Sequence, residues 1–247
     1  MTDRQKGIEQ VKLHTQEWGA GDRVALLVHG IMSDHRTWRR VGPALAERGY
    51  RVIAVDLRGH GASPRGTGET PAERYSPAQY AEDLVATLPT GAELAIGHSL
   101  GGLSLRWAVD RLRPQRAVFS DPAWLFADSG IDPELFVGFA AQATAEQITA
   151  MNPRWEPADV EVELATLAAW DPDSARSLTS HLGYAGLPDA PVVPSLVQLA
   201  DPSFLVGPMD AERLRERGFE VRTVQGAGHT IHRDDFEGFM TSLDGWI

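Results

Sequence analysis

The sequence lacks cysteine and contains only two lysines, Lys6 and Lys12. The absence of cysteine excludes disulfides, thiolate metal sites and cysteine nucleophiles, which leaves serine, aspartate and histidine as candidate catalytic groups. No apolar run approaches the roughly 18 residues that a membrane-spanning helix needs. Because the first 14 residues are polar and charged, they also lack the apolar core of a secretory signal. We therefore expect no membrane association and a cytoplasmic location.

Positive charge is also scarce, since 23 basic residues face 34 acidic ones and the formal net charge is −11. Nucleic acids and anionic lipids are bound through clustered Lys and Arg, so this balance opposes both as partners. A small-molecule substrate is the expected partner, and no prediction about the oligomeric state follows. The 247 residues suffice for one large α/β domain with an insertion.

Strand-like and helix-like segments alternate from residue 22 onward, which is typical of a doubly wound, mainly parallel sheet. The residues before them, 1–21, form either an arm or a leading hairpin; the alternation in 11–15 and the turn residues of 18–21 favour the hairpin. Strands are predicted at 23–28, 51–56, over the apolar run 94–96, and at 117–121, 193–200 and 219–224. Helices are predicted at 36–48, 77–88, after residue 99, at 208–217 and at the C-terminus.

The alternation stops between about residues 125 and 190. This stretch contains the helix-like pieces 133–150, 157–169 and 172–182, so we interpret it as a helical insertion. The core domain is then formed by residues 1–124 and 191–247. An exposed loop is predicted at 65–76, which is rich in Gly, Pro and Thr.

The stretch ELAIGHSLGGLS, residues 93–104, contains the pattern G-x-S-x-G centred on Ser99. An apolar run ends at Gly97, and apolar residues return after Ser99 at helical spacing. A serine at such a strand-to-helix turn takes a strained backbone conformation, and glycines on both sides avoid collisions with the neighbouring strand and helix. We predict that the Ser99 hydroxyl projects above the edge of the sheet.

Four separated motifs together resemble the α/β-hydrolase family. They are His29-Gly30, the segment DLRGHGAS at 56–63, GHSLGG at 97–102 and GAGH at 226–229. The resemblance covers residues 22–247 in order and spacing, and it weakens over 125–190. It implies an α/β-hydrolase core with 125–190 as a helical cap domain.

The resemblance implies that Ser99 is the nucleophile and His229 the general base that takes its proton. It places the oxyanion hole on the backbone N–H groups of Ile31 and Leu100. Met32, His98, Trp124 and Trp155 are the candidate substrate-binding residues, the tryptophans as part of an apolar roof. No cofactor and no metal are expected.

The acid of the triad departs from the common family pattern, because Ser203 occupies the position where most members have aspartate. Two carboxylates can replace it. Asp121 lies where the haloalkane dehalogenase branch of the family supplies its acid, and Asp201 lies two residues before Ser203. Each aspartate precedes a proline and could instead cap a turn or helix. The two assignments stay open at this point.

The predicted function is that of a serine hydrolase forming an acyl-enzyme with an ester or lactone of a small to medium, mainly apolar molecule, as an esterase or lactonase does. The same groups serve a carbon–carbon bond hydrolase or a cofactor-free perhydrolase. A third possibility is a ligand-binding protein that retains the fold without turnover, because fold alone does not carry function.

Overall fold

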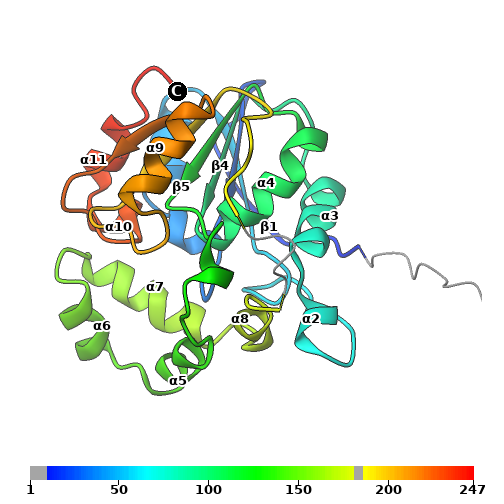
Figure 1. Cartoon of the computed structure of the whole chain (residues 1–247), viewed down its shortest axis with the longest axis vertical. Coiled ribbons are helices and arrows are strands. Elements are labelled where there is room, and N and C mark those ends of the chain that lie inside the picture. Colours follow the sequence, from blue (N-terminus) through cyan, green and yellow to red (C-terminus); the bar gives the residue numbers. More distant parts are fainter. Residues whose placement is uncertain (1–9, 181–185) are drawn as a thin grey trace, which may run out of the picture.

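A seven-stranded sheet forms the centre of the computed structural model, which describes residues 10–180 and 186–247 (Figure 1). The strand order is β1-β3-β2-β4-β5-β6-β7. All neighbouring strands are parallel except β1 and β3, which are antiparallel. The strands are β1 (Thr15–Trp18), β2 (Val24–Val28), β3 (Arg51–Val55), β4 (Leu94–His98), β5 (Arg116–Ser120), β6 (Ser195–Leu199) and β7 (Glu220–Thr223). The predicted doubly wound, mainly parallel sheet is confirmed.

The central strands consist almost wholly of apolar residues because both faces of the sheet are covered. Along β2, Leu26 and Val28 join the core on one face, whereas Ala25 and Leu27 join the core on the other. Helices α3 (Pro77–Thr87), α4 (Leu100–Leu112) and α9 (Pro208–Glu216) contribute to the first core. The second receives α1 (Val41–Glu47), α10 (Ile231–Asp234) and α11 (Phe236–Thr241).

The predicted helical insertion folds as α5 (Glu134–Gln142), α6 (Ala145–Met151), α7 (Pro157–Leu167) and α8 (Asp173–Arg176). These four helices lie together at one end of the sheet (Figure 1). Helices α6 and α7 supply a small core of Ile148, Val160 and Leu167, against which Phe139 and Ala140 of α5 pack. The boundaries 125 and 190 of a cap domain stay a prediction.

Three local predictions were wrong. The predicted hairpin does not form at the turn 18–21, because β1 pairs with β3 and not with β2. The loop 65–76 contains the short helix α2 (Pro71–Arg74), whose N-terminus is closed by Thr70 and Glu73. The predicted helix 133–150 is two helices, because Thr144 begins α6 as its N-cap and accepts a hydrogen bond from the Gln147 amide.

Other boundaries differ by a few residues. The predicted helix 36–48 begins with a 3₁₀ turn, η1 (His35–Trp38), before α1. The predicted helix 172–182 is helical only over α8, and its last two residues lie outside the described residues. A second 3₁₀ turn, η2 (Phe126–Asp128), follows β5.

Candidate active site

Ser99 occupies the turn between β4 and α4 with φ 51° and ψ −116°, a conformation that L residues rarely adopt. Backbone hydrogen bonds hold this turn: the Ser99 amide donates to the Ser120 carbonyl at 3.0 Å, and the Ala123 amide donates to the Ser99 carbonyl at 3.1 Å. The strained residue is thus tied to β5 and the loop that follows it.

The glycines around Ser99 are required by close backbone approach. A Cβ atom on Gly97 would lie 2.6 Å from the Gly101 carbonyl oxygen, and one on Gly101 would lie 2.2 Å from the Val28 carbonyl oxygen. Gly30, in the loop after β2, also leaves little room, since its Cβ would lie 2.9 Å from His98 Nδ1 and 3.1 Å from Ser99 Cβ. The G-x-S-x-G pattern therefore reflects the packing of a helix start against the ends of β2 and β4.

His229 and Asp121 are in direct contact at the site, with Nδ1 of the imidazole 2.6 Å from Oδ2 of the carboxylate. Asp121 follows β5 directly and is fully buried, and its other oxygen accepts from the Ala200 amide at 3.3 Å. Its φ is 41°, so the chain turns sharply there. A carboxylate on Nδ1 leaves Nε2 of His229 available as a proton acceptor.

Asp201 lies at the end of the neighbouring strand β6, but its carboxylate is used elsewhere. Oδ2 of Asp201 accepts from the Gly226 amide at 2.9 Å, and the Asp201 amide donates to the Ala227 carbonyl at 2.8 Å. Asp201 therefore braces the loop that carries His229. Of the two aspartates that the sequence left open, the structure brings Asp121 to His229.

His98, next to Ser99, supports the same loop. Its Nε2 lies 3.0 Å from the His229 carbonyl oxygen, and the two imidazole rings are 4.7 Å apart. Burial, with a smaller contribution from His229, holds the pKa of His98 well below its ordinary value. The ring is thus neutral, and because a carbonyl only accepts, Nε2 must carry the proton.

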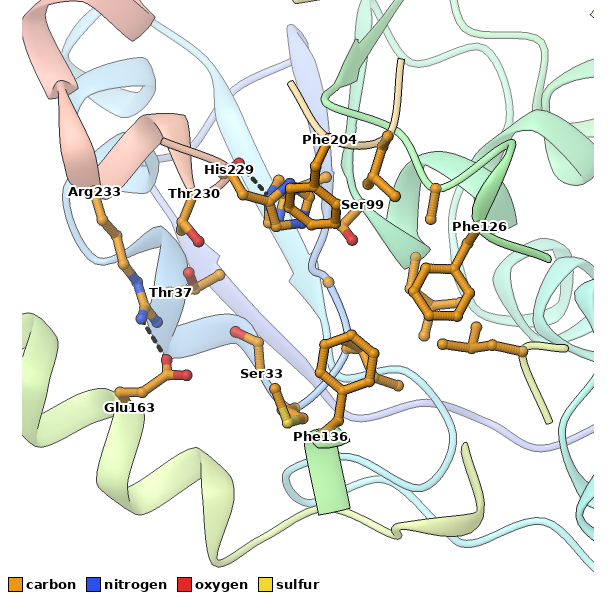
Figure 2. Close-up of a pocket in the computed structure, with 18 residues that line it drawn as sticks. Ser33, Thr37, Ser99, Phe126, Phe136, Glu163, Phe204, His229, Thr230 and Arg233 are labelled. Carbon is orange, nitrogen blue, oxygen red and sulfur yellow. Dashed lines mark hydrogen bonds and ion pairs between the residues drawn. The ribbon is translucent and has the colours of Figure 1, made fainter. Parts of the chain in front are cut away.

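A cavity of about 700 Å³, including its part open to solvent, lies over Ser99 and His229. Its apolar lining includes Ala123, Phe126, Phe136, Leu178, Phe204 and Leu205, and its polar lining includes Ser33, Thr37, Glu163, Thr230 and Arg233. In Figure 2 the polar group gathers on one side of the cavity, while Phe126 and Phe136 lie toward the other.

The candidate oxyanion hole lies in the same cavity, because both Ile31 and Leu100 line it. Leu100 is the first residue of α4, so its amide has no partner within the helix. A helix N-terminus also favours negative charge. Met32 lines the cavity too and packs against the core shared by the insertion helices.

The four predicted substrate-binding residues separate into two pairs. Met32 and His98 line the cavity, whereas Trp124 and Trp155 are absent from its lining among the described residues. Trp124 is fully buried and lines a smaller cavity of about 380 Å³. That cavity adjoins the first through four shared residues, which are Leu100, Ala123, Phe126 and Leu178. Trp155 instead stacks on Arg233, with the guanidinium carbon 4.6 Å from the ring centroid.

One cluster among the described residues has ligand atoms close enough for a metal ion: His14, His35 and Asp56. Each imidazole Nδ1 contacts a different oxygen of Asp56, at 3.0 and 2.8 Å. These hydrogen bonds satisfy the carboxylate without an ion. Burial would raise the pKa of Asp56, but the hydrogen bond with the His35 ring, the nearby His29 and the hydrogen bonds from the Ala62 and His35 amides together lower it below its ordinary value. The cluster is not part of the cavity lining.

Several cavity residues were not predicted from the sequence, above all Phe204, Glu163 and Arg233. Phe204 lies 4.9 Å from the His229 ring, measured between centroids. Its position next to Ser203, where the family usually has its acid, was an available signal. Glu163 and Arg233 come from distant segments, and no sequence pattern connects them.

Known proteins similar to this chain agree with the fold. The family model described as "Alpha/beta hydrolase family" matches residues 25–240. An epoxide hydrolase from Caballeronia sordidicola is 37% identical over 114 residues, which are 44% of this chain and 33% of that protein. A pimeloyl-[acyl-carrier protein] methyl ester esterase from Sodalis glossinidius is 37% identical over 140 residues, covering 53% of this chain and 51% of the esterase.

The structure of an M145A mutant of an epoxide hydrolase from Bacillus megaterium matches with a TM-score of 0.77, although only 13% of residues are identical; 96% of each chain is covered. The matched segments thus span a third to a half of the two sequence relatives, whereas the fold matches over nearly the whole chain. The protein is an enzyme of the alpha/beta hydrolase family. Among its described residues, no helix has both the length and the apolar character to cross a membrane.

Proposed function

We propose that this protein is a serine hydrolase that cleaves an ester or lactone through an acyl-enzyme. The observation that carries the proposal is the 2.6 Å contact between His229 Nδ1 and Asp121 Oδ2 beside a strained Ser99 that lines the same cavity. A buried carboxylate on Nδ1 orients the imidazole and stabilises its protonated form. A serine hydroxyl needs such a base to attack near neutral pH.

In the first step of the proposed reaction, Ser99 Oγ adds to the substrate carbonyl while His229 Nε2 takes the hydroxyl proton. The amides of Ile31 and Leu100 stabilise the negative oxygen that forms. His229 then protonates the departing alcohol, and the acyl-enzyme remains. In the second step His229 deprotonates a water molecule, which attacks the acyl carbon and releases the acid and Ser99.

The epoxide hydrolases among the similar proteins do not carry their named activity over to this site. Attack of a serine oxygen on an epoxide carbon would leave an ether on the enzyme, and water does not cleave an ether under such conditions. A carboxylate nucleophile would leave a hydrolysable ester instead. Because position 99 is serine, the proposal is acyl transfer. The mainly apolar lining of the cavity favours a small to medium, mainly apolar substrate.

The test combines active-site labelling with two matched variants. A fluorophosphonate should add to Ser99, as shown by intact mass and peptide mapping, and His229→Ala should abolish the reaction. Asp121→Asn should lower turnover of an activated ester by about 10⁴-fold, because loss of the acid costs that much in a comparable triad.

Asp201→Asn is the matched control, since it also changes an aspartate that precedes proline at the end of a neighbouring strand. An asparagine oxygen can still accept from the Gly226 amide, so this variant should retain most of the activity. Equal, small effects of the two variants would contradict the assignment of Asp121. A folded protein that is never labelled would instead favour a ligand-binding protein without turnover.

A further inference from the structure

An ion pair between Arg233 and Glu163 forms part of the cavity wall. Nη1 of Arg233 lies 2.6 Å from Oε2 of Glu163, and the exposed side-chain fractions are 2% and 14%. Arg233 belongs to α10, four residues after His229, whereas Glu163 belongs to α7 in the insertion. The pair therefore connects the core domain to the insertion at the edge of the proposed active site.

The guanidinium of Arg233 has donors that the described part of the chain leaves without an acceptor. Nε and Nη2 are buried and have no hydrogen-bond partner there, and the hydroxyl of Ser33 is buried without a partner as well. Nε–H and Nη2–H point in parallel from one edge of a guanidinium, which suits the two lone pairs of an oxygen atom or a planar oxygen group. Buried donors without acceptors are rare and costly in folded proteins.

The neighbouring polar groups do not supply the missing acceptor. The Thr37 hydroxyl lies 2.8 Å from His232 Nε2 and is already engaged. The face of the guanidinium is covered by the Trp155 ring. Because Arg233 and Ser33 both line the cavity, an oxygen atom of a molecule bound in the cavity is the acceptor that their position allows.

Charge balance decides what kind of oxygen this is. The positive charge of Arg233 is already neutralised by Glu163, so a carboxylate bound there would leave one uncompensated negative charge. Uncompensated buried charge is strongly unfavourable, and the protein as a whole already carries −11. An uncharged carbonyl oxygen accepts from the same donors without this cost.

We propose that the polar end of the cavity, formed by Ser33, Glu163 and Arg233, recognises an uncharged carbonyl oxygen of the substrate, such as that of an amide or ketone. This inference rests on the proposed function and narrows its substrate class. The substrate is an ester or lactone whose reacting carbonyl reaches Ser99, with a second, unreactive carbonyl toward Arg233 and an apolar portion toward Phe126 and Phe136 (Figure 2).

The experiment uses three esters of equal chain length that end in isopropyl, carboxamide or carboxylate, groups of similar shape. Each ending is placed once in the acyl chain and once in the alcohol, because the polar end receives one of the two halves of an ester. In one of the two positions, we expect kcat/KM for the carboxamide to exceed that for isopropyl by about 10- to 100-fold, as a donor left without its acceptor lowers binding. The carboxylate should be at least about tenfold worse than the carboxamide.

A variant tests the charge argument. Glu163→Gln keeps an oxygen acceptor for Arg233 Nη1 but removes the negative charge, so the site becomes cationic. The ratio of kcat/KM for the carboxylate ester to that for the carboxamide ester should then rise at least about tenfold. Glu161→Gln is the matched control, since this exposed glutamate lies on the same helix. The ratio of kcat/KM values in this variant should equal that of the original protein.

The outcomes separate the two proposals. Equal turnover of all three esters in both positions, with labelling of Ser99, would overturn this inference and leave the serine hydrolase proposal intact. A preference of the original protein for the carboxylate would overturn the charge argument, and so would an unchanged preference in Glu163→Gln. If no ester is cleaved and Ser99 is not labelled, both proposals fail.

Discussion

The buried histidines predict that the protein loses stability in mild acid, and His60 gives a magnitude. Burial, with a smaller contribution from His29, lowers the pKa of His60 to about 3. In the unfolded chain the pKa of histidine is about 6.5. Between these values the unfolded chain binds a proton that the folded protein does not, so folding is penalised as pH falls. From pH 7 to pH 5 this single group lowers the free energy of unfolding by about 2 kcal/mol.

Other histidines contribute with either sign. Burial also lowers the pKa of His29, His98 and His232, so each adds to the loss below pH 6.5. His35 acts in the opposite direction, because its hydrogen bond with Asp56 raises its pKa and this contribution is fully present in acid. Because His29, His98 and His232 add to the loss and only His35 opposes it, the total loss of unfolding free energy should exceed that of His60 alone.

The assay is urea unfolding at pH 7 and pH 5 for the original protein and for His60→Asn. Asparagine retains a donor near the Arg58 carbonyl, which His60 Nδ1 now contacts at 3.0 Å, but it does not titrate. The variant should lose about 2 kcal/mol less than the original protein between the two pH values. An equal loss in both proteins would refute the reasoning, because His60 would then have to take up its proton in the folded state.

Two further substitutions test the packing around the site. Gly30→Ala should lower kcat/KM for an activated ester at least about tenfold, because the added Cβ would lie 2.9 Å from His98 Nδ1. Its circular dichroism spectrum should change little. Gly138→Ala is the control: its added Cβ meets nothing within 4 Å, so kcat/KM should be unchanged. Asp83→Leu should lower the free energy of unfolding, measured in urea, by about 3 to 5 kcal/mol. The reason is that fully buried Arg58 loses the carboxylate that its Nε contacts at 2.5 Å. A loss below about 1 kcal/mol would contradict this expectation.

The regular parts of the fold could be predicted from local patterns. Strands covered on both faces appear as apolar runs, and the glycines around Ser99 report the close approach of α4 to β2 and β4. The two helix boundaries that were missed also had a local signal. Thr70 with Glu73, and Thr144 with Gln147, are capping boxes, in which a threonine side chain and a residue three positions later satisfy each other's amides.

The acid of the proposed triad had no comparable local signal. Asp121 and Asp201 both precede proline, and both follow strands that are adjacent and parallel, so they reach the same edge of the sheet. What separates them is the direction of each side chain. Asp121 turns toward His229 through its positive φ, whereas Asp201 is held by the Gly226 amide. Such a choice depends on the path of the 226–229 loop, which lies more than a hundred positions after Asp121.

The polar end of the cavity is even harder to predict from the sequence than the acid. Arg233 and Glu163 are 70 positions apart, and each alone is an ordinary charged residue of a short helix. Their pairing requires the insertion helices to close over the core domain, so it is a property of the tertiary structure alone. In the proposed site, specificity comes from the Nε and Nη2 donors of Arg233, which have no hydrogen-bond partner among the described residues. Their contribution to substrate binding depends on their burial, and no local sequence pattern encodes that burial.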